Sequence, residues 1–556
     1  TDDPAERLRL FEALGDMALV MLKDEERART CFAAAVASAQ PIEAKHIPLL
    51  EKLLARQELA KDHAGSGRTA ELMAAFGATA GERASRYVRA ARDYLAAGDP
   101  ARARGAADRA AESDPYDTDA VDLASGLAID QGDVDAAAGL LTRLLTAKED
   151  RAAGQVGRRA MLSFRLGHAR HQRGDTRQAL TAYEQAIRIA PDSDGATSAR
   201  RGMIELLRAT DDPSKKETVL GHLAAITAAT GALPDLVAWA DELRRQNKVD
   251  AAHATLELAI ACGHTADVHQ SAFLTIHKPY TMRTDEAYRA ALEPEERATI
   301  TDAGEAPLGP IASALAEAAA LLWPDLDEAL ARAGAAGAKR IPATLNIAAT
   351  AMFSRITTAL GAGAIMLHQQ DQGSDVTVVS AATPVIVLGP RMTTEATAAD
   401  DIRAQLARAV ELTRPEHLVF TGAHAKDAMI TPTRLIASVI RLFGPPALRE
   451  ATSSLVDDAD LQRGHDELVK SALSVKIRSR LEQLLATLPA TAFEVDRYIA
   501  ACQRTADRAA LLLGGAPKTI AALATARGET TSHLISAIAQ PSWLATRAKL
   551  GLGIRS

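Results

Sequence analysis

The chain has 556 residues, more than a single hydrophobic core accommodates, so two or three domains are expected. Apolar residues make up 47% of the sequence but aromatic residues only 3%, which favours closely packed helices over a sheet-rich fold. The formal net charge of −7 comes from interspersed charges of both signs and argues against nucleic acid as a partner.

The sequence carries no membrane or secretion signal that we can identify. No run reaches the roughly 18 apolar residues of a membrane span, so we expect a cytoplasmic protein. The first residue is Thr rather than Met, which leaves N-terminal processing or truncation open. Cys31, Cys262 and Cys502 lie far apart and fit neither a disulfide framework nor a paired metal site, so we expect small buried apolar side chains.

Repeats of a helical hairpin occupy the first half of the chain. The strongest copy contains Leu166, Gly167, Gly174, Ala179, Tyr183, Ala186 and Pro191. Similar patterns run from Tyr87 to Pro115 and from Gly132 to Leu144, and looser ones from Leu14 to Ala35 and from Leu236 to Ala259. This spacing resembles the 34-residue tetratricopeptide repeat (TPR). The resemblance predicts an α-solenoid over residues 1–270 that binds a protein or an extended peptide.

Some TPR domains bind a C-terminal carboxylate through basic residues and Asn on successive first helices of the repeats. The equivalent positions here are held by Val88, Arg92, Asp122, Gly126, Phe164, His168, Val237 and Asp241, which argues against such a clamp. Four polar residues remain as candidate partner contacts, namely Arg92, His168, His171 and Asp241. The alternative for each is an ordinary solvated helix residue.

The repeat pattern weakens after residue 270, and residues 271–342 are predicted to form a helical connector. Beyond it, the β-branched runs at 364–368, 375–380 and 384–389 predict short strands. A helix with Thr394 or Thr397 as N-cap follows, and helices continue to the end of the chain. The fold class is therefore mainly α, with an N-terminal solenoid and a C-terminal α+β domain that contains a small sheet.

Two segments of this C-terminal half, LARAVELTRPEH (406–417) and QRTADR (503–508), resemble the zinc metallopeptidases related to the CAAX prenyl protease, HtpX and the mitochondrial Oma peptidase. The resemblance implies a gluzincin-like domain over 343–535, followed by a C-terminal helix or tail at 536–556. It places Arg408 and Leu412 where two zinc-binding histidines stand, Ala409 at the general base and Gln503 at the ligating Glu. Asp507 and His417 match the family.

These replacements remove the chemistry of a catalytic zinc. Arg408 offers no lone pair, Ala409 and Leu412 offer no ligand atom or base, and Gln503 is a weak neutral ligand. We expect no enzyme, metal or cofactor at this site. The alternative of relocated ligands would draw on His417, His424, Glu411 and Glu416.

Arg408 invites a structural hypothesis. Its guanidinium is expected to contact Asp507 or Gln503 and so to replace a metal cross-link between two helices; pairing with Glu411 or exposure to solvent are the alternatives.

We therefore expect a non-enzymatic scaffold, in which the solenoid recruits a protein partner and a metal-free pseudopeptidase domain provides a second docking surface. Two alternatives stay open. One is an active zinc peptidase with relocated ligands and TPR targeting, and the other is a subunit of a larger homo-oligomeric or hetero-oligomeric assembly.

Overall fold

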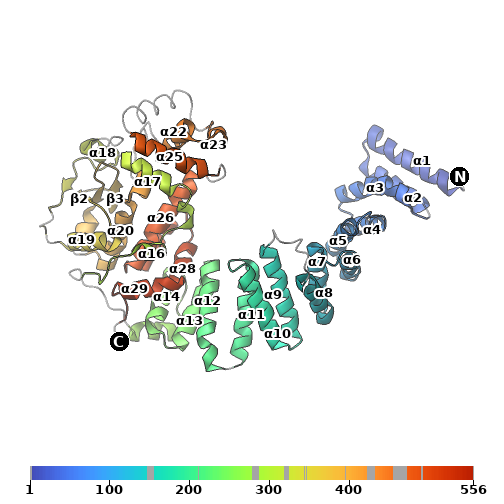
Figure 1. Cartoon of the computed structure of the whole chain (residues 1–556), viewed down its shortest axis with the longest axis horizontal. Coiled ribbons are helices and arrows are strands. Elements are labelled where there is room, and N and C mark those ends of the chain that lie inside the picture. The colour runs from blue at the N-terminus through green and yellow to red at the C-terminus, as the bar shows by residue number, and fades with distance from the viewer. Residues whose placement is uncertain are drawn as a thin grey trace. The chain divides into compact units, whose positions relative to one another are not determined.

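The computed structural model describes residues 3–39, 41–146, 156–210, 212–277, 287–318, 325–342, 345, 347–394, 396–421, 432–454, 473–489 and 493–554. The chain is mainly helical and divides into two compact units, Thr1–His222 and Leu223–Ser556 (Figure 1). None of the helices in the described ranges is long and apolar enough to cross a membrane.

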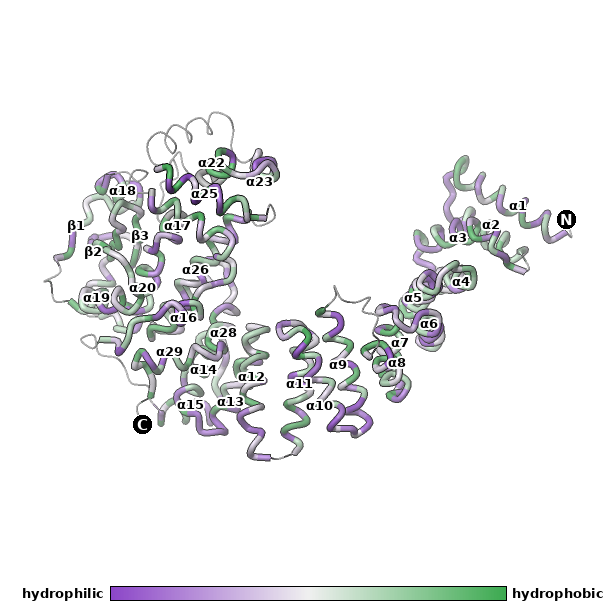
Figure 2. The backbone as a smooth tube through the Cα atoms, viewed as in Figure 1, coloured by the Kyte–Doolittle hydropathy of each residue, from purple (hydrophilic) through white to green (hydrophobic). Residues whose placement is uncertain are grey.

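The N-terminal unit is a solenoid of antiparallel helix hairpins. Its helices are α1 (Pro4–Met17), α2 (Glu25–Ser38), α3 (Ile47–Leu59), α4 (His63–Ala74), α5 (Ala80–Ala96), α6 (Pro100–Ser113), α7 (Thr118–Asp130), α8 (Val134–Thr146), α9 (Val156–Gln172), α10 (Thr176–Ile189) and α11 (Asp194–Ala209). Each helix packs against the next in the chain, and apolar and polar stretches alternate along them (Figure 2). The predicted α-solenoid of TPR-type hairpins is confirmed.

The turn inside several hairpins requires a left-handed backbone. Gly98, Gly132 and Gly174 have φ of 74°, 78° and 82° at the turns that follow α5, α7 and α9. Glycine adopts the left-handed backbone conformation without steric cost from a Cβ atom, which explains why the repeat pattern has glycine at these three positions. Asn247, with φ of 57°, occupies the corresponding turn between α13 (Leu233–Arg245) and α14 (Val249–Ala261), because Asn tolerates this conformation.

The glycine of the first helix in a hairpin allows an aromatic ring of the second helix to approach. A Cβ at Gly167 would lie 2.5 Å from the ring of the buried Tyr183, and a Cβ at Gly15 would lie 2.5 Å from Phe32. Helix pairs can therefore pack at close range only because these positions lack side chains.

Gly167→Ala is expected to destabilise the α9–α10 hairpin by about 1–3 kcal/mol, because the buried ring must shift to admit the methyl group. Gly139→Ala is a matched control in α8, since a Cβ at this exposed position meets nothing within 4 Å. The control should be neutral or stabilising by up to about 1 kcal/mol. Hydrogen–deuterium exchange of the α8, α9 and α10 amides measures both effects. Equal protection of α9 and α10 in Gly167→Ala and wild type would contradict the prediction.

The C-terminal unit contains a four-stranded mixed sheet. Its strands are β1 (Lys339–Arg340), β2 (Met366–Gln369), β3 (Val376–Val379) and β4 (Val385–Leu388), in the order β1-β2-β4-β3. β2 and β4 are parallel, with Met366 opposite Val385, whereas β3 and β4 are antiparallel, with Val376 opposite Leu388. All four residues of β4 are buried, as expected of a continuous apolar run in a central strand. The three predicted strands coincide with β2, β3 and β4.

Helices make up most of the rest of the described part of the unit. They are α13, α14, α15 (Val268–Ile276), α16 (Pro294–Arg297), α17 (Gly309–Ala318), α18 (Leu326–Arg332), α19 (Ala348–Leu360), α20 (Ala399–Leu412), α21 (Pro415–Thr421), α22 (Pro432–Phe443), α23 (Pro446–Ala451), α25 (Val475–Thr487), α26 (Val495–Leu512), α27 (Pro517–Ala526), α28 (Ser532–Ile538) and α29 (Pro541–Lys549). α12 (Lys216–Thr230) contains the boundary between the units. α20 packs against α19, β3 and α26, which positions it centrally.

The observed boundaries differ from the predicted ones in two places. The units meet between His222 and Leu223 rather than at residue 270, because α13 and α14 pack against α27 and α28. Within the segment predicted as a connector, α17 belongs to the core, since Ile311 and Leu315 are buried in one cluster with Tyr498 of α26.

Candidate functional site

The two segments that resemble the peptidase family lie on helices that face each other. α20 carries Arg408. α26 packs against it and carries Gln503 and Asp507, which lie one helical turn apart from each other. Arg408 Nε donates to Asp507 Oδ1 at 2.5 Å, and Arg408 Nη2 donates to Gln503 Oε1 at 2.5 Å. The expected contact of Arg408 with Asp507 and Gln503 is therefore present. Its side chain is only 14% exposed, so the solvent alternative is wrong.

Glu411, the alternative partner of Arg408, is engaged elsewhere. Its Oε1 accepts a hydrogen bond from Arg297 Nη1 at 2.7 Å, and Arg414 Nε lies 3.7 Å away. Arg297 Nη2 also donates to the Leu360 carbonyl at 2.5 Å, which ties α16 to α19 and α20. The alternative in which Glu411 pairs with Arg408 is wrong, because the Glu411 carboxylate pairs with Arg297 of α16.

Asp507 is the centre of a buried polar network. Its Oδ1 is bound by Arg408. Its other oxygen, Oδ2, accepts from Arg527 Nη2 at 2.5 Å and lies 3.2 Å from His533 Nε2. The carboxylate is fully buried. Burial raises the pKa of Asp507, but the hydrogen bond from His533 and the charges of Arg408 and Arg527 outweigh burial and hold the pKa below its usual value. The ionised carboxylate links α20, α26, the turn after α27, and α28.

Ala409 and Leu412 line the same region of α20 without polar atoms. They are 3% and 6% exposed and contribute to the apolar core of the unit. A zinc ion placed on this face of α20 would meet a guanidinium at 408 and hydrocarbon at 412. The side chains present do not fit a catalytic zinc of the peptidase type.

A second buried cluster, formed by Glu305, His417 and Cys502, was not found from the sequence. Glu305 ends the short helix η4 (Ala303–Glu305), His417 lies on α21 and Cys502 on α26. His417 Nε2 lies 2.9 Å from Glu305 Oε2, and the three potential ligand atoms lie within 4.8 Å of one another. We name this group the Glu305 cluster. It lies on a different stripe of α26 from Gln503 and Asp507.

Neighbouring groups orient His417 and Glu305 in the Glu305 cluster. His417 Nδ1 lies 3.0 Å from the Glu411 carbonyl oxygen, and the Thr505 hydroxyl donates to Glu305 Oε1. Burial lowers the pKa of His417, but the hydrogen bond and charge of Glu305 outweigh burial and raise it above its usual value. Burial, together with the charge of Glu305, raises the pKa of the Cys502 thiol. Of the three cysteines, only Cys502 is fully buried; Cys31 and Cys262 are half-buried, contrary to expectation.

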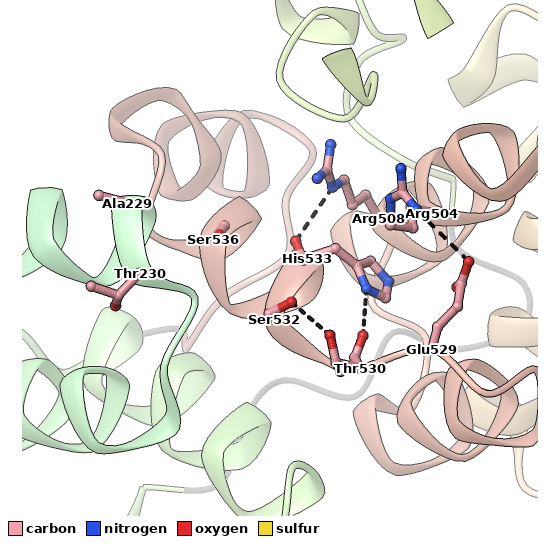
Figure 3. A pocket seen from close by; sticks show the side chains of 9 residues that line it. All are labelled: Ala229, Thr230, Arg504, Arg508, Glu529, Thr530, Ser532, His533 and Ser536. Carbon is pink, nitrogen blue, oxygen red and sulfur yellow. Dashed lines mark hydrogen bonds and ion pairs between the residues drawn. The ribbon is translucent and has the colours of Figure 1, made fainter. Parts of the chain in front are cut away.

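A polar cavity of about 410 Å³ lies beside α26 and α28 (Figure 3). It is lined by Ala229, Thr230, Arg504, Arg508, Glu529, Thr530, Ser532, His533 and Ser536. Arg504 Nε and Nη2 both donate to Asp302, at 2.9 and 3.1 Å, and Arg508 Nη2 lies 3.0 Å from the same carboxylate. Both guanidinium groups are therefore already paired, which leaves the cavity with little surplus positive charge.

The four candidate partner contacts are divided between the units. Arg92 is exposed on α5, and His168 and His171 are half-buried on α9, where His168 stacks on Phe164 with ring centroids 6.1 Å apart. Asp241 lies on α13 in the other unit and accepts from Gln270 Nε2 at 3.2 Å. Arg92, His168 and His171 lie in the N-terminal unit and Asp241 lies in the C-terminal unit, and all four stay candidate partner contacts.

Two of the residues predicted as relocated metal ligands are engaged in ion pairs. Glu416 accepts a hydrogen bond from Arg414 Nε at 2.7 Å, and Glu411 is paired with Arg297. His424 lies outside the described residues. Among the described members of this set, His417 is grouped with other potential metal ligands, Glu305 and Cys502, and these come from segments that the sequence did not connect to it.

Comparisons with known proteins identify no family. No family model matches the chain, and no curated protein matches it. Solved structures that are similar to this chain include MamA, which has 14% sequence identity to it. The match covers 34% of this chain and 94% of MamA, with a TM-score of 0.24. YrrB, described as a TPR protein with an unusual peptide-binding site, is 16% identical, with coverages of 34% and 90% and a TM-score of 0.25. PilF of Pseudomonas aeruginosa is 13% identical, with coverages of 49% and 99% and a TM-score of 0.28.

These TM-scores lie below 0.5, so the similarities carry no argument about function. The TPR-type assignment of the solenoid rests on the hairpins themselves and on the small and aromatic residues that pack them.

Proposed function

We propose that this protein is a non-enzymatic scaffold. In this proposal the solenoid recruits a protein partner, and the C-terminal unit is a pseudopeptidase-like domain that provides a second docking surface. The single observation that supports it best is the contact of Arg408 with both Asp507 and Gln503. It fills the place where the resemblance to zinc peptidases puts the metal.

The electrostatics of that contact favour a structural role. Arg408 and Asp507 are removed from water, and a buried ion pair is tolerated only when its remaining hydrogen-bonding groups are also satisfied. Gln503, Arg527 and His533 meet this requirement for the pair. A dication would have to displace the Arg408 guanidinium and leave its charge buried beside the metal. The network therefore favours a domain without hydrolytic zinc.

The partner surface is proposed on the first helices of the solenoid hairpins. In a TPR-type solenoid these helices line one surface, and Arg92, His168 and His171 lie on the first helices α5 and α9. A polar surface with cationic and imidazole groups suits a peptide or protein segment that supplies acceptors.

Affinity capture with the intact chain tests the proposal. The surface variant is the triple replacement Arg92→Ala, His168→Ala, His171→Ala. Its matched control replaces exposed residues on the second helices, Arg102→Ala, Arg177→Ala and Glu184→Ala. We expect the surface variant to weaken capture of the principal partner at least tenfold, which is about 1.4 kcal/mol, and the control to leave it unchanged.

Two results would count against the scaffold. Equal loss of the partner in both triple variants would show that the first-helix surface is not the binding surface. Cleavage of casein by the purified chain with added zinc, abolished by a chelator, would show a peptidase instead.

A further inference from the structure

We propose that the Glu305 cluster binds one zinc ion. Glu305, His417 and Cys502 supply a carboxylate, an imidazole and a thiol from three segments that are separate in the sequence. They are 6%, 1% and 0% exposed, so the ligands converge inside the unit rather than on its surface. This site is distinct from positions 408, 412 and 503 on the α20 side of α26.

The donor set selects the metal. Thiolate and imidazole ligands suit zinc and disfavour magnesium and calcium, which prefer oxygen ligands. Zinc binds Cys sulfur at about 2.3 Å and His nitrogen or carboxylate oxygen at about 2.0–2.2 Å, which places tetrahedral ligand atoms roughly 3–4 Å apart. The ligand atoms of the Glu305 cluster already lie within 4.8 Å of one another. Small rotations of the side chains complete the coordination distances.

Hydrogen bonds around the cluster match those of a metal site. A zinc-binding histidine usually donates its other ring N–H to a carbonyl or carboxylate, and His417 Nδ1 lies 3.0 Å from the Glu411 carbonyl oxygen. This contact directs His417 Nε2 toward Glu305 and Cys502. Thr505 donates to Glu305 Oε1 and accepts from the Asp302 amide at 2.8 Å, so the second carboxylate oxygen is also held.

The charges also balance. The Glu305 carboxylate and a Cys502 thiolate together neutralise a dication, and the buried site becomes neutral when the metal is bound. The nearby acids Glu411 and Glu416 are compensated by Arg297 and Arg414.

The expected role of this zinc is to hold η4, α21 and α26 together. The ligands come one from each of these elements. Neither the cavity of about 410 Å³ nor a smaller one of about 100 Å³ between α14, α20 and α29 is lined by any of the three ligands. The inference therefore goes beyond the scaffold proposal and does not depend on it.

Metal content of the full chain tests the site. The protein is supplied with zinc, dialysed against metal-free buffer and measured by plasma mass spectrometry. We expect about one zinc per wild-type chain and per Cys31→Ser, Cys262→Ser double variant, which keeps Cys502 as the only thiol. Cys502→Ser should lose at least nine-tenths of the metal. With cobalt in place of zinc, wild type and the double variant should show a thiolate-to-cobalt charge-transfer band that Cys502→Ser lacks.

X-ray absorption of the zinc-loaded double variant gives a readout that does not require Cys502→Ser to fold. One sulfur neighbour at about 2.3 Å is expected. Failure of wild type to retain zinc, a zinc shell without sulfur, or undiminished zinc in Cys502→Ser would each overturn the site. Zinc bound without sulfur and accompanied by casein cleavage would overturn the scaffold proposal as well, whereas absence of zinc would leave that proposal intact.

Discussion

Asp507→Ala is expected to destabilise the C-terminal unit by about 3–5 kcal/mol, because it leaves the guanidinium group of Arg408 buried without its counter-charge. The cost comes from this unpaired cation rather than from the lost attraction alone. Urea unfolding of the full chain, followed by tryptophan fluorescence, measures the change, since Trp239 and Trp543 are buried in this unit.

Asp496→Ala is the matched control, because Asp496 lies in the exposed first turn of the same helix. Its loss should cost at most about 1 kcal/mol through the helix dipole. A change of less than 1 kcal/mol in Asp507→Ala would show that the network is not structural, and the scaffold proposal would lose its main support.

The same carboxylate gives the network a characteristic pH dependence. The folded-state pKa of Asp507 lies below its ordinary value, so the stability it contributes is fully present above the unfolded pKa of about 3.9. That contribution disappears as the pH falls through the folded pKa. The difference in unfolding free energy between wild type and Asp507→Asn should therefore be constant near neutral pH and shrink only below about pH 4.

Local residue patterns predicted the parts of the fold that depend on neighbours in sequence. The solenoid follows from glycines and aromatic residues such as Gly167 and Tyr183, whose contact lies within one hairpin. Strands β3 and β4 follow from the β-branched runs VTVV and VIVL. The prediction that Thr394 or Thr397 caps α20 was wrong, because the N-cap residue is Ala398. The Thr397 hydroxyl instead donates to the Arg391 carbonyl at 2.6 Å. The threonine is used by the preceding turn instead.

Contacts between distant segments explain what the sequence could not predict. Arg408 and Asp507 were connected through a resemblance that supplied both positions, and their contact is present. Glu305 and His417 are 112 residues apart, and no spacing pattern links them to Cys502. The prolines and charges of 271–342 resemble those of a linker, although Ile311 and Leu315 of the same segment are buried. Burial of this kind is decided by the tertiary structure.

The C-terminal segment illustrates the same point, because residues 536–556 were separated in prediction as a terminal helix or tail. In the structure Trp543 of α29 is 1% exposed, and α29 packs against α26 and α28. Beyond the helix, the Leu550 carbonyl accepts from the Arg289 amide at 3.1 Å, and the Ile554 amide donates to Asp250 Oδ1 at 2.9 Å. The segment is therefore part of the unit.

Trp543→Ala is accordingly expected to destabilise the C-terminal unit by about 3–5 kcal/mol, because it removes a large buried ring and leaves a cavity between α26, α28 and α29. Ser542→Ala, at the exposed neighbouring position, should change stability by no more than about 0.5 kcal/mol. Circular dichroism during urea unfolding measures both variants without relying on the replaced tryptophan. If Trp543→Ala unfolds at the wild-type midpoint, α29 is a detachable tail and the packing of its ring contributes nothing to the unit.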